Sequence, residues 1–203
     1  MSQDTVRVPR QKRSMEKRDA ILRASYELFC EKGYFKTNTA EIAKAAKVST
    51  GIVYNYFHDK HDILKAVVTR YVADLEARFS HIPHTPGDDP RDLAERLLNA
   101  LIASHTMAPA AHNEFMALAL LDPEIQAIFS DFERRFTQRI GAALLAAGTP
   151  SYLLEEKLRI SFGIIEQLCH DHIQGRLDEP GLARAKAVAV QTITDLLKTN
   201  CQP

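Results

Sequence analysis

The sequence predicts an all-α protein, in which a small N-terminal domain of three helices precedes a larger helical domain, with about nine helices in all. Three observations predict this fold class. Apolar residues recur at helical spacing along most of the 203 residues. No stretch alternates apolar and polar side chains for long enough to predict a strand. The eight glycines and nine prolines stand mostly between the periodic segments.

Composition limits the class of protein. Hydrophobic residues make up 45% of the chain and charged residues 26%, which is the balance of a globular protein. A bilayer crossing takes about twenty mainly apolar residues, and no such run occurs. The first twenty residues lack the apolar segment of a secretory signal. Cys30, Cys169 and Cys201 are too widely spaced for a disulfide framework or a zinc motif. We therefore expect a cytoplasmic protein.

Charge is unevenly distributed along a chain whose net charge is zero. Residues 1–62 contain twelve Lys or Arg against eight Asp or Glu, and the remainder contains fourteen against eighteen. This asymmetry indicates a small basic module on an acidic body. Residues 1–15 are polar and basic, and we expect them to form a flexible arm. The arm either contacts nucleic acid or is a solvated tail.

Capping residues and periodicity define the N-terminal helices. A first helix is expected over residues 15–32, ended by Gly33. The spacing of Asn38 and Glu41 is that of a capping box at the start of a second helix. Ser49 is a good N-cap for a third helix that ends near residue 57. A longer helix, capped by Asp59, then runs to about residue 80.

Prolines mark the helices of the C-terminal part, each near a helix start. After a loop at residues 81–90, helices are expected at about 90–107, 110–121, 123–147, 151–176 and 180–200. The helix at 151–176 carries two apolar stripes, one through Phe162 and Ile165 and a second through Ile160. A helix that is apolar on two faces must bury both, so one face needs a partner chain or a ligand.

The helices over residues 38–57 are two short helices joined by a tight turn, which is the pattern of a helix-turn-helix. With Val53 and Phe57 facing inward, Gly51 and Asn55 point outward. A helix that enters the major groove needs small or polar residues on that face.

The segment IAKAAKVSTGIVYNYFHDKHDIL at residues 42–64 strongly resembles the signature of TetR-family transcriptional regulators, and the resemblance extends back to about residue 16. It implies a DNA-binding domain at residues 16–62 and a ligand-binding and dimerisation domain at residues 63–203. The residues that the resemblance places against bases or in the groove are Thr50, Gly51, Tyr54 and Asn55. Those that it places against phosphates are Thr37, Tyr56 and Lys60.

Two positions depart from the family pattern, and we add both to the expected phosphate contacts. Asn38 stands where threonine or serine is usual and is at least as good an N-cap. Lys47 stands where glycine is usual in the turn. If the backbone there has positive φ, lysine strains it by about 1 kcal/mol.

The resemblance further implies a homodimer that binds a palindromic operator in double-stranded DNA. It also implies a cavity in the larger domain for a small apolar or amphipathic effector of unknown identity. The expected interface residues are Phe162, Ile165, Ala185, Ala189, Ile193 and Leu196. The expected cavity residues are His105, His112, Met116, Phe132, Phe162 and Gln167. The full prediction is a ligand-responsive repressor.

Other functions are less well supported by the sequence. No nucleophile elbow, phosphate-binding loop or metalloprotease motif occurs, so we expect no catalytic residues and no enzyme. His170 and His172 are about 200° apart on a helix and cannot bind one ion together, so no metal or cofactor is expected. Two alternatives stay open: a helical dimeric interaction module that has lost operator binding, and a ligand-blind regulator whose cavity is filled by side chains.

Overall fold

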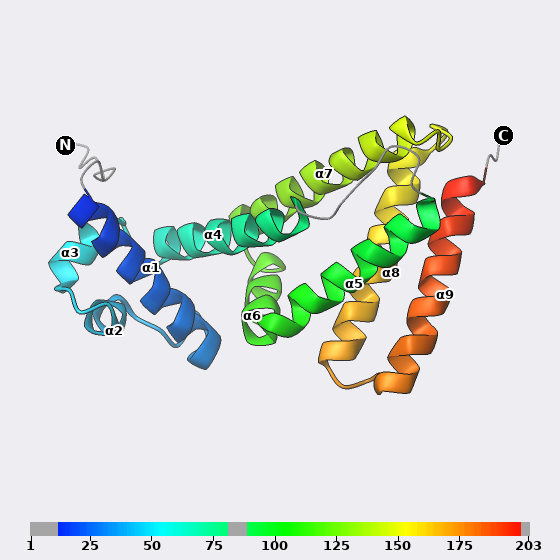
Figure 1. The fold of residues 1–203 in the computed structure, drawn as a ribbon. Helices are drawn as coiled ribbons and strands as arrows, with labels where there is room; N and C mark the ends of the chain where they lie inside the picture. Colours follow the sequence, from blue (N-terminus) through cyan, green and yellow to red (C-terminus); the bar gives the residue numbers. More distant parts are fainter. Residues whose placement is uncertain (1–11, 81–88, 200–203) are drawn as a thin grey trace. The chain divides into compact units, whose positions relative to one another are not determined.

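The computed structural model describes residues 12–80 and 89–199, in which every regular element is an α-helix (Figure 1). This confirms the predicted fold class. The N-terminal helices are α1 (Lys12–Lys32), α2 (Thr39–Ala45), α3 (Thr50–Tyr54) and α4 (Lys60–Ser80). The others are α5 (Pro90–Met107), α6 (Pro109–Ala119), α7 (Pro123–Ala146), α8 (Leu154–Ile173) and α9 (Glu179–Lys198). None of these helices combines the length and hydropathy that a bilayer crossing demands.

Helix ends differ from expectation at three places. Helix α1 begins at Lys12, so residues 12–15 belong to the helix and the rest of the expected arm lies outside the described residues. Helix α3 ends at Tyr54, because the amide of Asn55 is shared between carbonyls of the preceding turn. Helix α8 is shorter than expected at both ends: Leu153 has a left-handed backbone before it, and Gly175 has one after it. Of the loop expected at residues 81–90, residues 81–88 also lie outside the described part.

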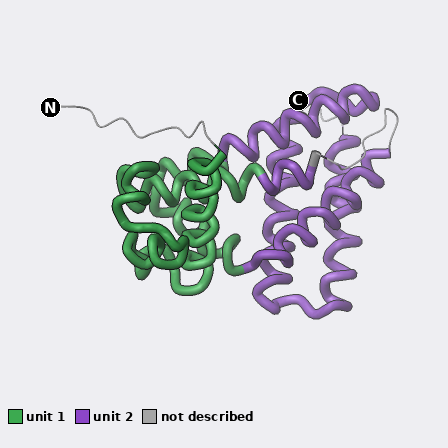
Figure 2. Tube along the Cα trace, turned by 60° about the vertical axis from the view of Figure 1, so that its left-hand side comes forward, with its two compact units in different colours: residues 1–73, 110–129 green, residues 74–109, 130–203 purple. Residues whose placement is uncertain are grey.

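The chain divides into two compact units, shown in Figure 2. Unit 1 contains residues 1–73 and 110–129, and unit 2 contains residues 74–109 and 130–203. The division differs from the domain boundary expected at residue 62, because unit 1 takes in α6 and the adjoining parts of α4 and α7.

Aromatic contacts explain why α6 belongs to unit 1. Phe115 of α6 is fully buried, and its ring centre lies 6.0 Å from that of Tyr26 in α1 and 5.3 Å from that of Tyr71 in α4. A carboxylate oxygen of Glu114 accepts a hydrogen bond of 2.6 Å from the backbone amide of Tyr34. Unit 1 is thus a core of three neighbouring helices with the helix-turn-helix attached to α1.

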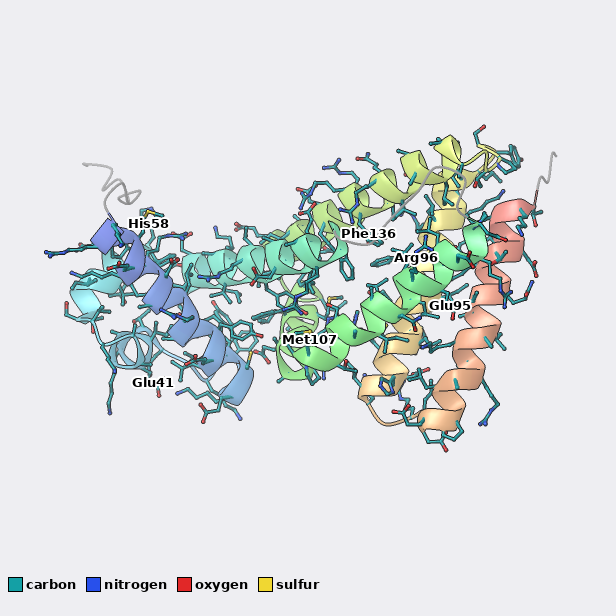
Figure 3. The ribbon with its side chains drawn as sticks, in the orientation of Figure 1. Glu41, His58, Glu95, Arg96, Met107 and Phe136 are labelled. Atoms are coloured by element: carbon teal, nitrogen blue, oxygen red, sulfur yellow. The ribbon has the colours of Figure 1, made fainter. Side chains whose placement is uncertain are left out.

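Unit 2 is built on α5, α8 and α9, which pack against one another. Its aromatic side chains form a cluster that begins at Phe79 in the last turn of α4. Phe136 of α7, labelled in Figure 3, lies 5.4 Å from Phe79, 6.0 Å from Phe132 and 6.0 Å from Phe162 between ring centres. This cluster joins α4, α7 and α8 within unit 2.

Candidate nucleic-acid interface

Local hydrogen bonds fix the starts of the two short helices. The Asn38 side chain accepts from the amide of Glu41 at 3.0 Å, and the Glu41 carboxylate accepts from the amide of Asn38 at 3.1 Å. The predicted capping box is therefore confirmed; Figure 3 shows Glu41 on α2. The ammonium of Lys32 and the amide of Asn38 hold the pKa of Glu41 below its ordinary 4.5. Ser49 caps α3 through the amide of Ile52 at 3.4 Å, as predicted.

The turn between the two helices contains a left-handed residue. Lys47 has φ 56°, and its side chain is exposed. The backbone therefore has the positive φ at which lysine is strained. Because the side chain is exposed, its charge is accessible to a phosphate.

The outward face of α3 consists of residues that the packing of the protein does not require. Val53 is fully buried and Phe57 is 3% exposed, which confirms the predicted inward face. Thr50, Gly51 and Asn55 are exposed. A Cβ built on Gly51 would meet only the Ser49 hydroxyl, at 3.9 Å, which is an ordinary contact. Nothing within the protein thus demands glycine at position 51.

Two tyrosines flank this face. The hydroxyl group of each forms a hydrogen bond with a hydroxyl group from another helix. The hydroxyl of Tyr54 lies 3.1 Å from that of Thr39 at the start of α2. The hydroxyl of Tyr56 lies 2.8 Å from that of Ser14 in the first turn of α1. Neither Thr39 nor Ser14 was among the residues expected from the sequence. Ser14 was missed because the first helix was expected to begin only at residue 15.

Two of the expected phosphate contacts have other partners in the structure. Thr37 is 2% exposed, and its hydroxyl donates to the carbonyl oxygen of Gly33 at 2.9 Å. The structure does not support a contact between the Thr37 side chain and a phosphate, because that side chain is buried and occupied. The Lys60 ammonium donates to the carbonyl oxygens of Tyr34 and Thr37 at 2.9 and 2.8 Å. Partial burial lowers the pKa of Lys60.

The six residues expected to line an effector cavity are divided between the two units. His112 and Met116 belong to unit 1, where a ring nitrogen of His112 lies 3.4 Å from the hydroxyl of Tyr71. The others belong to unit 2, and there Gln167 is exposed and donates to Asp171 at 2.9 Å. A groove of about 610 Å³ does run between α7 and α8, but none of the six residues lines it.

The expected interface residues are divided between the interior and the surface of the chain. Ile165, Ala189 and Ile193 are buried within unit 2, because α8 and α9 face each other and α5. Phe162, Ala185 and Leu196 are half-buried. The large apolar side chains that α8 and α9 expose are Ile160 and Val188, which are 54% and 66% exposed. Periodicity had located the apolar stripes but not the direction in which each one faces.

Residues 21–67 match the sequence profile of the family described as "Bacterial regulatory proteins, tetR family". This segment contains the capped helices α2 and α3 and the exposed face of α3. Residues 21–67 of this chain therefore form a TetR-family segment.

Three curated relatives are named as helix-turn-helix-type transcriptional regulators. The regulator HbdR of Aromatoleum sp. is 29% identical over 146 residues, covering 68% of this chain and 60% of HbdR. The regulator BetI of Stenotrophomonas maltophilia is 26% identical over 179 residues, covering 74% of this chain and 91% of BetI. The regulator YuxN of Bacillus subtilis is 32% identical over 105 residues, and this chain spans 34% of its length.

Solved structures of transcriptional regulators share the fold over nearly the whole chain. A transcriptional regulator from Rhodococcus sp. Rha1 gives a TM-score of 0.74 at 20% identity, covering 91% of this chain and 99% of that one. The fatty acid degradation regulator FadR from Bacillus halodurans gives a TM-score of 0.65 at 19% identity, covering 92% and 96%. The TetR-family fold therefore extends through the C-terminal helices, where the sequence signature is absent.

Proposed function

We propose that this TetR-family protein is a sequence-specific DNA-binding transcriptional repressor in the cytoplasm. The observation that carries the proposal is the outward face of α3. Thr50, Gly51 and Asn55 are exposed there, and Tyr54 is 50% exposed beside them. Polar side chains and a residue without a Cβ allow a helix to approach base edges closely. Asn55 can make the bidentate contact with adenine that the major groove favours.

Exposed cationic side chains of the same N-terminal segment support the same proposal. Lys12, Arg13, Lys36, Lys44 and Lys47 are exposed on α1, α2 and the connecting turns. Lysine and arginine bind phosphates without reading sequence, and they set the register of the protein on the duplex. A helix that reads DNA needs small or polar residues toward the bases and basic residues that bind the phosphates.

A selection experiment tests DNA binding directly. The purified protein selects from a pool of random DNA fragments at about 0.15 M salt, in parallel with Asn55→Ala. Asn55 is exposed, and its C-cap bonds are made by the backbone amide, so the substitution leaves the fold intact. Enrichment of a palindrome that the variant loses or alters supports the proposal. Equal pools from both proteins, with no enriched sequence, contradict it and favour the interaction module without an operator.

We further propose that two copies bind the palindrome as a dimer through α8 and α9. Because Ile165, Ala189 and Ile193 are buried within the chain, the contact uses the outer faces of the helices, with Ile160 and Val188 as apolar anchors. Sedimentation of Ile160→Glu with Val188→Glu tests this arrangement. A shift from dimer to monomer is expected, and an unchanged dimer contradicts it.

The response to a small apolar or amphipathic effector is proposed to pass through α4, which contributes residues to both units. To release DNA about a hundredfold, the effector must favour the non-binding state by about 2.7 kcal/mol. A thermal-shift screen of small molecules separates this proposal from a ligand-blind regulator. A ligand at a hundred times its dissociation constant adds about 2.7 kcal/mol of stability, whereas a cavity filled by side chains gives no shift.

A further inference from the structure

Three side chains of unit 2 meet between α5 and α8. Nε2 of His105 lies 3.2 Å from a carboxylate oxygen of Glu166, and Nε2 of His170 lies 3.9 Å from the same oxygen. The donor atoms of all three residues lie within 4.8 Å of one another. Glu166 and His170 are four residues apart and share one face of α8, while His105 approaches from α5.

The spacing of these atoms fits a single small cation. Zn²⁺ binds imidazole nitrogens and carboxylate oxygens at about 2.0–2.1 Å, with tetrahedral angles. Two ligand atoms of such a site are therefore about 3.3–3.4 Å apart. The distances of 3.2 and 3.9 Å from Glu166 to the two histidines bracket this value. An ion would draw these donor atoms closer together, and shifts in side-chain torsion allow this movement.

The buried histidine is oriented as a metal ligand is. Nδ1 of His105 lies 2.8 Å from the carbonyl oxygen of Leu101. A carbonyl oxygen only accepts, so Nδ1 carries the hydrogen and Nε2 faces Glu166. Metal-binding histidines almost always donate their other ring N–H to a carbonyl or carboxylate in this way, which fixes the ring. His105 is 6% exposed, whereas the side chains of Glu166 and His170 are 22% and 31% exposed, so one side of the site is open to solvent.

We propose that His105, Glu166 and His170 form a binding site for a divalent transition-metal ion of the Zn²⁺ class. Two imidazoles and one carboxylate suit Zn²⁺, Ni²⁺ or Co²⁺, and they do not suit Mg²⁺ or Ca²⁺, which prefer oxygen ligands alone. The site links α5 to α8 and does not depend on DNA binding.

Without a metal ion, the same side chains can form an ion pair, and an experiment must distinguish this pair from a metal site. Burial lowers the pKa of His105, but hydrogen bonds with Cys169 and Glu166 outweigh it and raise that pKa to about 10. Without an ion, His105 and Glu166 therefore form an imidazolium–carboxylate pair. A metal ion must displace that proton, and the titration is best made at about pH 8, where proton release costs less than at lower pH.

Metal titration of the full-length protein, with any purification tag removed and after dialysis against a chelator, tests the site. Calorimetry with Zn²⁺ is expected to give one ion per chain, and Co²⁺ is expected to give the visible absorption of a tetrahedral complex. Glu166→Gln keeps the shape of the side chain but removes the carboxylate. We expect it to weaken Zn²⁺ binding by about tenfold or more, and His170→Ala to do the same.

Two control variants of α8 separate this site from surface binding. Glu156→Gln removes an exposed carboxylate from the same helix, and His172→Ala removes a histidine two residues from His170. Both are expected to bind Zn²⁺ as the wild type does. The proposal is overturned if the wild type binds no ion stoichiometrically, or if Glu166→Gln binds as tightly as Glu156→Gln. Loss of binding in His172→Ala alone also overturns it, because the ion would then be held elsewhere.

Discussion

The side chain of Lys60 contacts Tyr34 twice, since its ammonium nitrogen lies 2.9 Å from the Tyr34 carbonyl oxygen and 4.2 Å from the centre of the Tyr34 ring. These contacts join the first turn of α4 to the loop between α1 and α2. The family signature placed Lys60 against a phosphate. In the structure, two of the three N–H donors of its ammonium are directed at carbonyl oxygens of the chain itself.

Lys60→Met, which keeps the apolar stem, is therefore expected to destabilise the protein. It removes two charge-assisted hydrogen bonds at a partly exposed site, and we expect the free energy of unfolding to fall by about 1–2 kcal/mol. Urea denaturation measures the change. The control is Lys44→Met, at an exposed position of α2, where a change within about 0.5 kcal/mol is expected. If Lys60→Met kept full stability and lost only DNA affinity, Lys60 would be a phosphate contact.

Gly51→Ala separates folding from DNA binding. A Cβ at position 51 has room within the protein, and alanine favours the helix, so the stability should be unchanged or higher by about 0.5 kcal/mol. The same methyl group would stand between α3 and the DNA, and affinity for the selected operator should fall about tenfold, or 1.4 kcal/mol. Denaturation and a DNA titration of one protein preparation check both parts. Unchanged operator affinity would mean that this face of α3 does not approach the bases.

Features fixed by neighbouring residues could be predicted from the sequence. The capping box of Asn38 and Glu41, the Ser49 cap and the burial of Val53 all depend on residues within one or two turns of a helix. The predicted starts of α5 and α7 at Pro90 and Pro123 were correct for the same reason, because proline is tolerated in the first turn.

Features that depend on distant residues could not be predicted. The partners of Lys60 follow from the contact of the first turn of α4 with the loop between α1 and α2, more than twenty residues away in sequence. Likewise, the pair Glu166 and His170 is visible as an i, i+4 spacing, but only the packing of α5 on α8 adds His105. A periodic pattern shows that a stripe is apolar, and it does not show whether its own chain or another covers it.

Lys47 has a strained left-handed backbone and a positive charge, and two substitutions separate their effects on stability and on DNA binding. Lys47→Gly relieves the left-handed backbone and should raise the free energy of unfolding by about 1 kcal/mol. Lys47→Ala keeps the strain and removes only the charge. If Lys47 binds a phosphate, both variants should lower the slope of log K against log salt by about 0.9 in magnitude. Equal stability of the two variants, measured by denaturant unfolding, would show that the strain is absent. An unchanged salt slope would remove the phosphate contact.

The pair formed by His61 and Asp122 within unit 1 should make stability sensitive to acid. Nε2 of His61 donates to the Asp122 carboxylate at 2.6 Å, and the other carboxylate oxygen caps α7 through the amide of Glu124 at 2.9 Å. Partial burial raises the pKa of Asp122, but these hydrogen bonds and one from the amide of Ile125 outweigh it and lower that pKa below 3.8.

A carboxyl group whose pKa is lower in the folded state stabilises the fold above its unfolded pKa, and this stabilisation is lost as the pH falls through the folded value. Asp122→Asn keeps a side chain that caps helices well and removes only the charge. We expect it to cost about 0.5–1 kcal/mol near pH 7 and less near pH 3, where the carboxyl group is largely protonated in the unfolded chain. Urea unfolding at both pH values measures the difference, with Asp131→Asn at an exposed position of α7 as the control. The same loss at both pH values would show that the charge of Asp122 does not stabilise the fold.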